Sequence, residues 1–169
     1  MRIYKILLLF LFSFLTLDIF AELEIPDHSG EYFELSFIDA LSSDSISTID
    51  MKGKIIIVNF WFSECLPCQD TTPLIRSLYE KYSSENVFFI GINMDRERSM
   101  FLKYCEENGI TRPQFFEENK NWDTSVALEW DVAMTPMFFV INTEGIIVEN
   151  TVSIKTLEYI IEKEIKEKT

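Results

Sequence analysis

The sequence predicts an α/β domain in which buried strands alternate with helices. Residues 55–62 form an apolar, β-branched run, which predicts a strand buried on both faces. In residues 74–82, apolar side chains recur at three- and four-residue spacing, which predicts a helix directly after that strand. Near the end of the chain, two apolar runs joined by Thr143-Glu144-Gly145 predict a hairpin before a last amphipathic helix.

The size and composition of the chain favour one domain with a substantial core. The chain has 169 residues, of which 47% are hydrophobic and 14% aromatic. Its net charge of −13 argues against nucleic acid or an anionic membrane surface as a partner. Basic or neutral protein partners are easier to accommodate.

The first 21 residues have the pattern of a secretory signal peptide. Arg2 and Lys5 form a positive segment, residues 6–17 are apolar, and residues 19–21 (Ile-Phe-Ala) form a cleavage site. We therefore expect export to the periplasm or another extracytoplasmic space. The alternative is an uncleaved membrane anchor.

Cleavage is the favoured interpretation of this segment. Its apolar run is shorter than the ~20 residues that span a bilayer, and Asp18 interrupts it. With no cysteine near the cleavage site, lipoprotein processing is not expected. The mature domain would then comprise residues 22–169.

The segment that follows is polar and rich in turns. Residues 32–38 suggest a strand, and residues 45–49 suggest a second short one. His28 is the only histidine and lies in the loop-like sequence PDHSG, so we expect it on the surface. A single histidine excludes a multi-histidine metal site, and its place in a loop argues against histidine-based activation of a nucleophile.

Two cysteines lie where the first strand gives way to its helix. The free N–H groups and the positive dipole end of the first helical turn stabilise a thiolate at Cys65. Cys68 faces inward, close enough for the two sulfurs to bond, and Pro67 suits a helix start because it has no N–H to satisfy. The predicted chemistry is reversible dithiol–disulfide exchange. The alternatives are a structural disulfide, which would close too short a loop to restrict much chain entropy, and a zinc site.

The second half of the chain continues the alternation of strands and helices. Pro73 should kink the first helix, and residues 87–93 predict the next buried strand. Residues 96–108 predict a helix ended by Gly109. Cys105 lies on its apolar face, so we expect a buried, inert thiol rather than a resolving or regulatory one. Further elements are expected at residues 114–116 (strand), 124–130 (helix), 137–142 and 146–152 (hairpin) and 154–168 (helix).

The motif WFSECLPC, with Pro73 eight residues after the first cysteine and Thr135-Pro136 before the apolar run MFFVI, resembles the thioredoxin fold. The lead-in Lys52-Gly53-Lys54 and the ending INTEGIIV are most similar to exported thiol-disulfide oxidoreductases of the TlpA/ResA type, over residues 34–166. The resemblance implies a thioredoxin-like three-layer fold, with a central mixed sheet flanked by helices, an N-terminal β-hairpin and a β-α insertion within residues 95–134.

The resemblance also implies roles for individual residues. Cys65 and Cys68 would be catalytic, a cis Pro136 would face them, and the backbone of Thr135 would pair with an extended substrate. Trp61 would pack beside the site and limit access to it, although a plain core position fits it equally well. The substrate-contacting residues expected on this basis are Trp61, Leu66, Pro67, Thr135 and Pro136.

The resemblance further implies partners but no cofactor. The redox group would be the Cys65–Cys68 disulfide itself, with no metal. We expect a monomer that acts on disulfide-containing proteins, receives electrons from a membrane-bound thiol reductant, and serves cytochrome c biogenesis or antioxidant activity.

Three residues depart from the pattern of relatives. Asn59 replaces the buried aspartate of cytoplasmic thioredoxins, and Thr71 stands where several relatives have a glutamate. This leaves water or Glu64 to accept the proton of Cys68. Glu64 itself stands where relatives commonly have tryptophan, and its carboxylate opposes a thiolate at Cys65 that the helix dipole favours. Glu64 and Asn59 are therefore candidate modulators of the cysteine pKa.

Three other functions fit the sequence less well. A peroxiredoxin-like peroxidase needs threonine or serine three residues before its cysteine, where this chain has Phe62. Copper delivery in relatives uses a wider cysteine spacing and a distal histidine, and both are missing here. A non-catalytic binding module would not need both cysteines.

Overall fold

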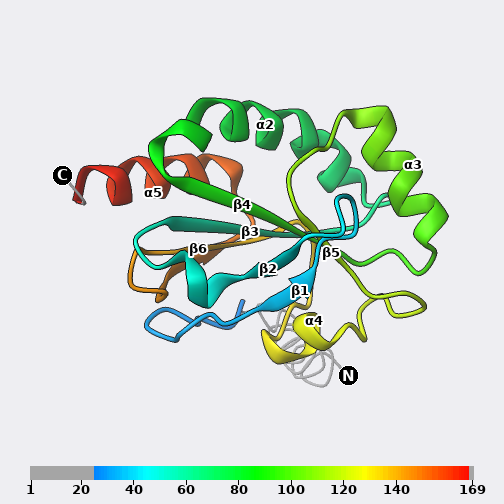
Figure 1. The fold of residues 1–169 in the computed structure, drawn as a ribbon, viewed down its shortest axis with the longest axis horizontal. Helices are drawn as coiled ribbons and strands as arrows, with labels where there is room; N and C mark the ends of the chain where they lie inside the picture. Colours follow the sequence, from blue (N-terminus) through cyan, green and yellow to red (C-terminus); the bar gives the residue numbers. More distant parts are fainter. Residues whose placement is uncertain (1–24, 168–169) are drawn as a thin grey trace, which may run out of the picture.

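The computed structural model describes residues 25–167, so the expected signal segment and its cleavage site lie outside the described residues. A five-stranded mixed sheet forms the centre of the molecule (Figure 1). Its order is β5-β4-β3-β6-β7, with β3 parallel to β4 and antiparallel to β6. The strands are β3 (Ile55–Trp61), β4 (Val87–Asn93), β5 (Gln114–Phe116), β6 (Met137–Ile141) and β7 (Ile147–Thr151).

Helices cover one face of this sheet, and the N-terminal hairpin with a short helix covers the other. The helices are α2 (Leu66–Tyr82), α3 (Arg98–Asn108), α4 (Ser125–Glu129) and α5 (Ile154–Glu167), with short 3₁₀ turns η1 (Thr48–Met51) and η2 (Ser83–Glu85). Helices α2 and α5 lie together along one face (Figure 1), where Lys81 Nζ is 3.0 Å from Glu158 Oε1. The three-layer α/β fold is thereby confirmed.

The two faces of β3 explain why every residue of its sequence except Asn59 is apolar. Ile55 and Ile57 pack into the core beneath α2 and α5. Val58 and Phe60 point the opposite way, into the core that includes Phe33 from the N-terminal segment. Successive side chains of a strand alternate between faces, so a strand covered on both sides is buried at every position, as β3 is.

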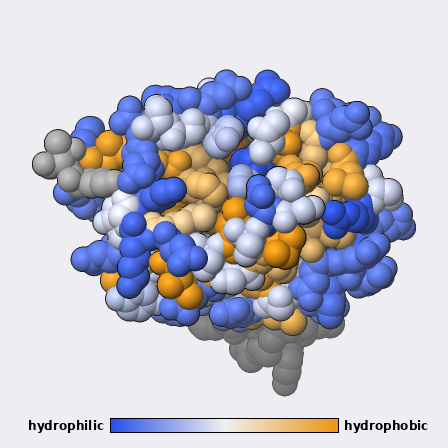
Figure 2. All heavy atoms as spheres, in the orientation of Figure 1, coloured by the Kyte–Doolittle hydropathy of each residue, from blue (hydrophilic) through white to orange (hydrophobic). Residues whose placement is uncertain are grey.

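The N-terminal hairpin is present but shorter than the sequence suggested. It consists of β1 (Ser36–Ile38) and β2 (Ser45–Ser47), which form a separate antiparallel pair. Tyr32 forms only an isolated bridge to Ile146. On the face that carries β1 and β2, hydrophobic side chains remain visible between hydrophilic ones (Figure 2).

The expectation of a surface position for His28 is wrong. Its side chain is buried at 8% exposure, with its ring 5.6 Å from that of Trp130 and 5.9 Å from that of Phe139. Nδ1 lies 3.1 Å from a carboxylate oxygen of Glu31. The neighbours of His28 in the sequence are polar, and they did not indicate that its ring packs against Trp130 and Phe139.

The expected insertion between β4 and β6 contains α3, β5 and α4. Strand β5 extends the sheet by pairing in parallel with the end of β4. Gly109 ends α3 with φ of 62°, and its N–H is bonded to the carbonyl of Cys105. Pro73 lies inside α2 as predicted. No helix within residues 25–167 is both long and apolar enough to cross a membrane.

Candidate active site

Cys65 is the N-cap of α2 and is joined to Cys68 by a disulfide, with the two Cα atoms 5.1 Å apart. The Cys65 sulfur accepts a hydrogen bond of 3.1 Å from the backbone N–H of Cys68. In an ordinary N-cap a side-chain oxygen takes this position. A free N–H group of the first turn, that of Cys68, therefore points at the sulfur on which a thiolate would form, as the sequence predicted.

Thr135 approaches the same sulfur from the loop before β6. The Thr135–Pro136 bond is cis, as the resemblance implied. The Cys65 sulfur lies 3.6 Å from the backbone oxygen of Thr135 and 3.3 Å from its hydroxyl oxygen. The hydroxyl adds a neutral donor to Cys65 that the sequence did not reveal.

Trp61 supports the cysteines from the inside. It packs in one apolar cluster with Cys65, Cys68 and Phe101. Only 2% of Trp61 is exposed, so it offers no surface to a docked substrate. This corrects the expectation of a substrate contact and leaves the core position, which fitted the sequence equally well.

Gln114 holds the indole of Trp61 in place. Trp61 Nε1 donates a 3.0 Å hydrogen bond to Gln114 Oε1, and both side chains are buried. The Gln114 backbone N–H donates to Asp39 Oδ1 at 2.8 Å, and its side-chain N–H donates to the carbonyl of Arg112 at 3.1 Å. A Cβ at Gly91 would overlap the Gln114 amide, so only glycine on β4 leaves room for this contact.

A buried carboxylate fixes the loop between β3 and α2. Asp95 Oδ1 accepts hydrogen bonds from the N–H and hydroxyl of Ser63 at 3.0 and 2.8 Å, and Asp95 Oδ2 accepts one from Asn93. Gln69 donates to the carbonyl of Ser63 at 2.8 Å. Because β3 and β4 are parallel, their carboxyl ends meet at one edge of the sheet. That relation could have identified Asp95 from the sequence.

The three residues that depart from the pattern lie in different surroundings. Asn59 is buried on β3, and its Oδ1 has no hydrogen-bond partner within residues 25–167. The Thr71 hydroxyl donates to the carbonyl of Pro67 at 3.0 Å, so the backbone of α2 occupies it. Glu64 is exposed beside Cys65. Thr71 is therefore no substitute for a carboxylate.

Cys105 is buried in the same apolar cluster as the cysteine pair. Burial raises the pKa of its thiol to about 12, although the buried Arg112 guanidinium works in the opposite direction. The same burial lowers the pKa of Arg112 to about 10. At neutral pH Cys105 is a protonated thiol, as the inert role requires.

The side chains around Cys65 divide into buried and exposed ones. Leu66 is 71% exposed, and Pro67 is also exposed, while Pro136 is buried. Within residues 25–167, no group of three or more His, Cys, Asp or Glu side chains is arranged to hold a metal ion.

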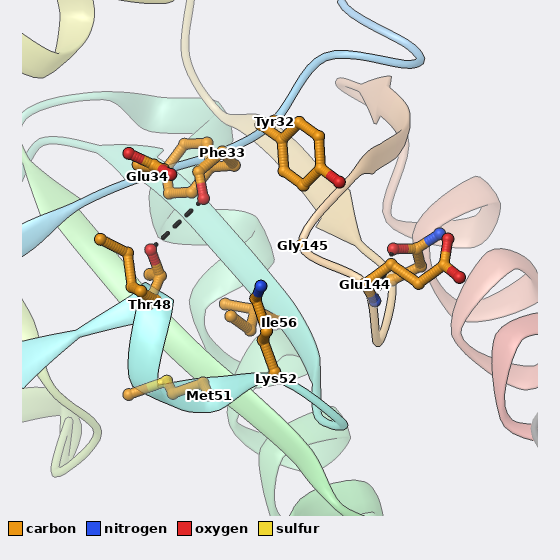
Figure 3. Close-up of a pocket in the computed structure, with 11 residues that line it drawn as sticks. Tyr32, Phe33, Glu34, Thr48, Met51, Lys52, Ile56, Glu144 and Gly145 are labelled. Carbon is orange, nitrogen blue, oxygen red and sulfur yellow. Dashed lines mark hydrogen bonds between the residues drawn. The ribbon is translucent and has the colours of Figure 1, made fainter.

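A cavity of about 70 Å³ lies at the opposite edge of the sheet from the cysteines. Ile56 near the start of β3 and the turn at Gly145 line it, together with Tyr32 and Lys52 (Figure 3). Thr48 closes one side by donating its hydroxyl to the carbonyl of Phe33 at 3.3 Å (Figure 3). This cavity belongs to the junction of the hairpin with the sheet and not to the cysteine site.

Comparison with known proteins agrees with this geometry. Residues 53–147 match the family model described as thioredoxin-like. The thiol-disulfide oxidoreductase ResA of Bacillus subtilis (strain 168) is 28% identical over 125 residues, which are 74% of this chain and 60% of the relative. ResA of Bacillus cereus is 26% identical over 70% of this chain and 66% of the relative. The chain thus spans less than two thirds of the length of these curated relatives.

Solved structures give the same family. The thioredoxin domain of a thiol-disulfide oxidoreductase from Bacteroides vulgatus is 26% identical with a TM-score of 0.70, covering 82% of this chain and 98% of the other. A thiol:disulfide interchange protein from Bacteroides sp. is 25% identical with a TM-score of 0.69, covering 85% and 93%. Together with the ResA relatives, these structures confirm the similarity to ResA-type proteins that was predicted from the lead-in Lys52-Gly53-Lys54 and the ending INTEGIIV. With its mixed sheet, its cysteine pair at the start of α2 and its cis-proline, the chain belongs to the thioredoxin-like family.

Proposed function

We propose that this protein is an exported thiol-disulfide oxidoreductase that reduces disulfides of extracytoplasmic proteins. The observation that carries the proposal is the environment of the Cys65 sulfur. It lies at the N-terminus of α2 and accepts from the N–H of Cys68, and it also faces the backbone and hydroxyl of Thr135. A thiolate there is stabilised by neutral donors and lies beside a backbone edge suited to an extended peptide.

The reaction is a two-step exchange. The Cys65 thiolate attacks one sulfur of the substrate disulfide, which forms a mixed disulfide and releases the other sulfur as a thiolate. Cys68 then loses its proton and attacks the Cys65 sulfur, which releases the second substrate thiolate. Two electrons pass to the substrate, and the protein is left with the Cys65–Cys68 disulfide. Water or Glu64 takes the proton from Cys68, because Thr71 is bonded to the helix backbone.

The cellular setting is part of the proposal. Export rests on the signal-peptide pattern of residues 1–21. A membrane-bound thiol reductant would restore the dithiol, and the protein would act as a monomer. Cytochrome c maturation is the proposed pathway, on the resemblance to the TlpA/ResA type.

Trapping of mixed disulfides tests the mechanism. In a Cys105→Ala background, Cys68→Ser should accumulate mixed disulfides with a reducible protein such as insulin, because the resolving thiol is missing. Cys65→Ser should accumulate none, since the attacking thiol is missing. Both variants should lose catalytic insulin reduction. Trapping by Cys65→Ser and not by Cys68→Ser would refute the assignment of roles.

A further inference from the structure

The N-terminal hairpin is connected to the cysteine site by a chain of buried polar groups. Asp39, in the turn between β1 and β2, accepts a 2.8 Å hydrogen bond from the backbone N–H of Gln114. Gln114 Oε1 in turn accepts a 3.0 Å hydrogen bond from the indole N–H of Trp61. Trp61 packs in one apolar cluster with Cys65 and Cys68. Two hydrogen bonds and one layer of apolar packing therefore join the hairpin turn to the reacting sulfurs.

The hairpin turn also fixes the backbone of Gln114. Gln114 begins β5, an edge strand of three residues that pairs with the end of β4. Such a short edge strand is only weakly fixed by its own ladder of hydrogen bonds. The N–H of Ala40, the next residue in the turn, donates to the carbonyl of Gln114 at 2.9 Å. The place of the acceptor for Trp61 thus depends on the turn at Asp39 and Ala40.

The carboxylate of Asp39 holds the turn itself together. Its Oδ2 accepts hydrogen bonds from the N–H and the hydroxyl of Ser42 at 3.2 and 2.6 Å, and the residue is only 4% exposed. Burial alone would raise the pKa of this carboxyl, but the hydrogen bonds from Ser42, Gln114 and Leu41 hold the pKa below its usual range. Asp39 is therefore a charged acceptor at neutral pH, and its oxygens are used within the protein.

A buried polar chain of this kind contributes geometry more than net stability. Burying polar groups costs free energy that their hydrogen bonds roughly offset, whereas a fully bonded network favours one arrangement over others. Here the group that is fixed is the indole of Trp61. On its other side the ring packs near Tyr104 and Phe101 of α3, with centroids 5.3 and 6.3 Å away. The indole is therefore held beside the cysteine pair and has little freedom to move away.

We propose that Gln114 and Asp39 are positioning residues that lower the reduction potential of the Cys65–Cys68 pair by holding Trp61 beside it. Reduction replaces the bond between the sulfurs by two separate thiols, which need more room in a close-packed cluster. A ring that cannot move resists this expansion and favours the disulfide, so the dithiol becomes the stronger reductant. The inference rests on the proposed exchange chemistry and gives the N-terminal hairpin a part in it.

The reduction potential separates positioning from a merely structural role. It compares the oxidised and reduced folded protein, so a variant that destabilises both forms equally leaves it unchanged. In the full chain equilibrated with glutathione, Gln114→Leu and Asp39→Ala should each lower the equilibrium constant for disulfide formation at least about threefold, a potential about 14 mV higher. Asp39→Asn keeps an oxygen acceptor for the N–H of Gln114 and should keep the wild-type value.

Two comparisons show whether the effect passes through Trp61. The Trp61→Phe background has no indole N–H, so there Gln114→Leu should change the equilibrium constant by less than about 1.5-fold. The matched control is Leu157→Ala. Leu157 is buried in the core cluster beneath α2 and α5, which contains neither Trp61 nor a cysteine. The control should lower stability in urea through its cavity and leave the equilibrium constant unchanged.

The outcomes separate this inference from the proposed function. Wild-type equilibrium constants in both Gln114→Leu and Asp39→Ala would overturn the positioning role, as would an equal shift in Leu157→Ala. A shift by Gln114→Leu that is the same with and without the indole of Trp61 would also overturn it. None of these results affects the reductase, which mixed-disulfide trapping tests separately. If circular dichroism shows that Gln114→Leu does not fold, the comparison of Asp39→Ala with Asp39→Asn decides.

Discussion

The region beneath the cysteines and the surface around them are built in opposite ways. Beneath the pair, Trp61, Gln114 and Asp95 are each at most 4% exposed and are joined to neighbouring segments by hydrogen bonds. Between the two cysteines, Leu66 is 71% exposed and Pro67 is exposed as well. The buried region fixes the position of the sulfurs, and the exposed region is free to meet a substrate. Changes in the first should therefore affect stability, and changes in the second should affect substrate choice.

Gly91→Ala should have the largest effect on stability. The new Cβ overlaps the Gln114 amide and breaks its bond to Trp61. Overpacking costs about 1–3 kcal/mol and an unsatisfied buried N–H about 1–3 kcal/mol. Alanine also lowers the conformational entropy of the unfolded chain, which stabilises the folded protein by only about 0.4–1 kcal/mol. The free energy of unfolding should therefore fall by about 2–4 kcal/mol. Urea denaturation of the reduced and oxidised protein would measure it.

A second substitution tells whether this cost comes from Gln114. Gln114→Ala alone should cost about 1–3 kcal/mol, because Trp61 Nε1 loses its acceptor. In that background Gly91→Ala should cost little more, since the overlapping side chain is gone. Strictly additive costs would show that Gly91 is needed for another reason.

Thr135→Val should have a smaller effect, confined to reactivity. It removes the hydroxyl that donates to the Cys65 sulfur while keeping the shape of the side chain. Loss of about 1 kcal/mol of thiolate stabilisation should slow alkylation of reduced Cys65 by iodoacetamide at pH 7 about fivefold. Thr135→Ser keeps the hydroxyl and should react like the wild type. An unchanged rate for Thr135→Val would show that the α2 N-terminus alone stabilises the thiolate.

Cys105→Ala should have the smallest effect, with insulin reduction within about twofold of the wild type. Since burial raises the pKa of this thiol to about 12, Cys105 should resist iodoacetamide at pH 8 in the folded protein and react in urea. In the unfolded chain the thiol has its ordinary pKa of 9.0, which gives the sign of the pH effect. Cys105 leaves stability unchanged below about pH 9 and lowers it between about pH 9 and 12, where only the unfolded chain ionises. A tenfold loss of turnover with the fold intact would place Cys105 in the mechanism.

The sequence predicted the elements that follow a regular pattern. The apolar run of β3 and the cysteine pair at the start of α2 were visible because burial and helix starts leave local signatures. The structure also shows a cis Pro136, which only the family resemblance suggested. His28 was misplaced because its polar neighbours face solvent while its ring packs against Trp130.

The hydrogen bonds that hold the cysteine site in place could not be predicted from local sequence patterns. The bond between Trp61 and Gln114 joins residues 53 positions apart, and that between Ser63 and Asp95 joins residues 32 apart. Such pairs depend on how strands lie beside one another, which periodicity in one segment does not reveal. The 3.3 Å approach of the Thr135 hydroxyl to Cys65 likewise depends on the path of the loop before β6.

The reduction potential of the Cys65–Cys68 pair tests the central claim that this protein is a reductant. Strong oxidants of this fold stabilise the reduced form by favouring the thiolate. Leu66 and Pro67 have no side-chain donors, and the donors that the structure places on the Cys65 sulfur, the Cys68 N–H and the Thr135 hydroxyl, are both neutral. Equilibration against glutathione should give a value nearer about −270 mV, as in thioredoxin, than about −120 mV, as in DsbA. A potential above roughly −170 mV on that scale would contradict the reductant account and indicate an oxidase or isomerase.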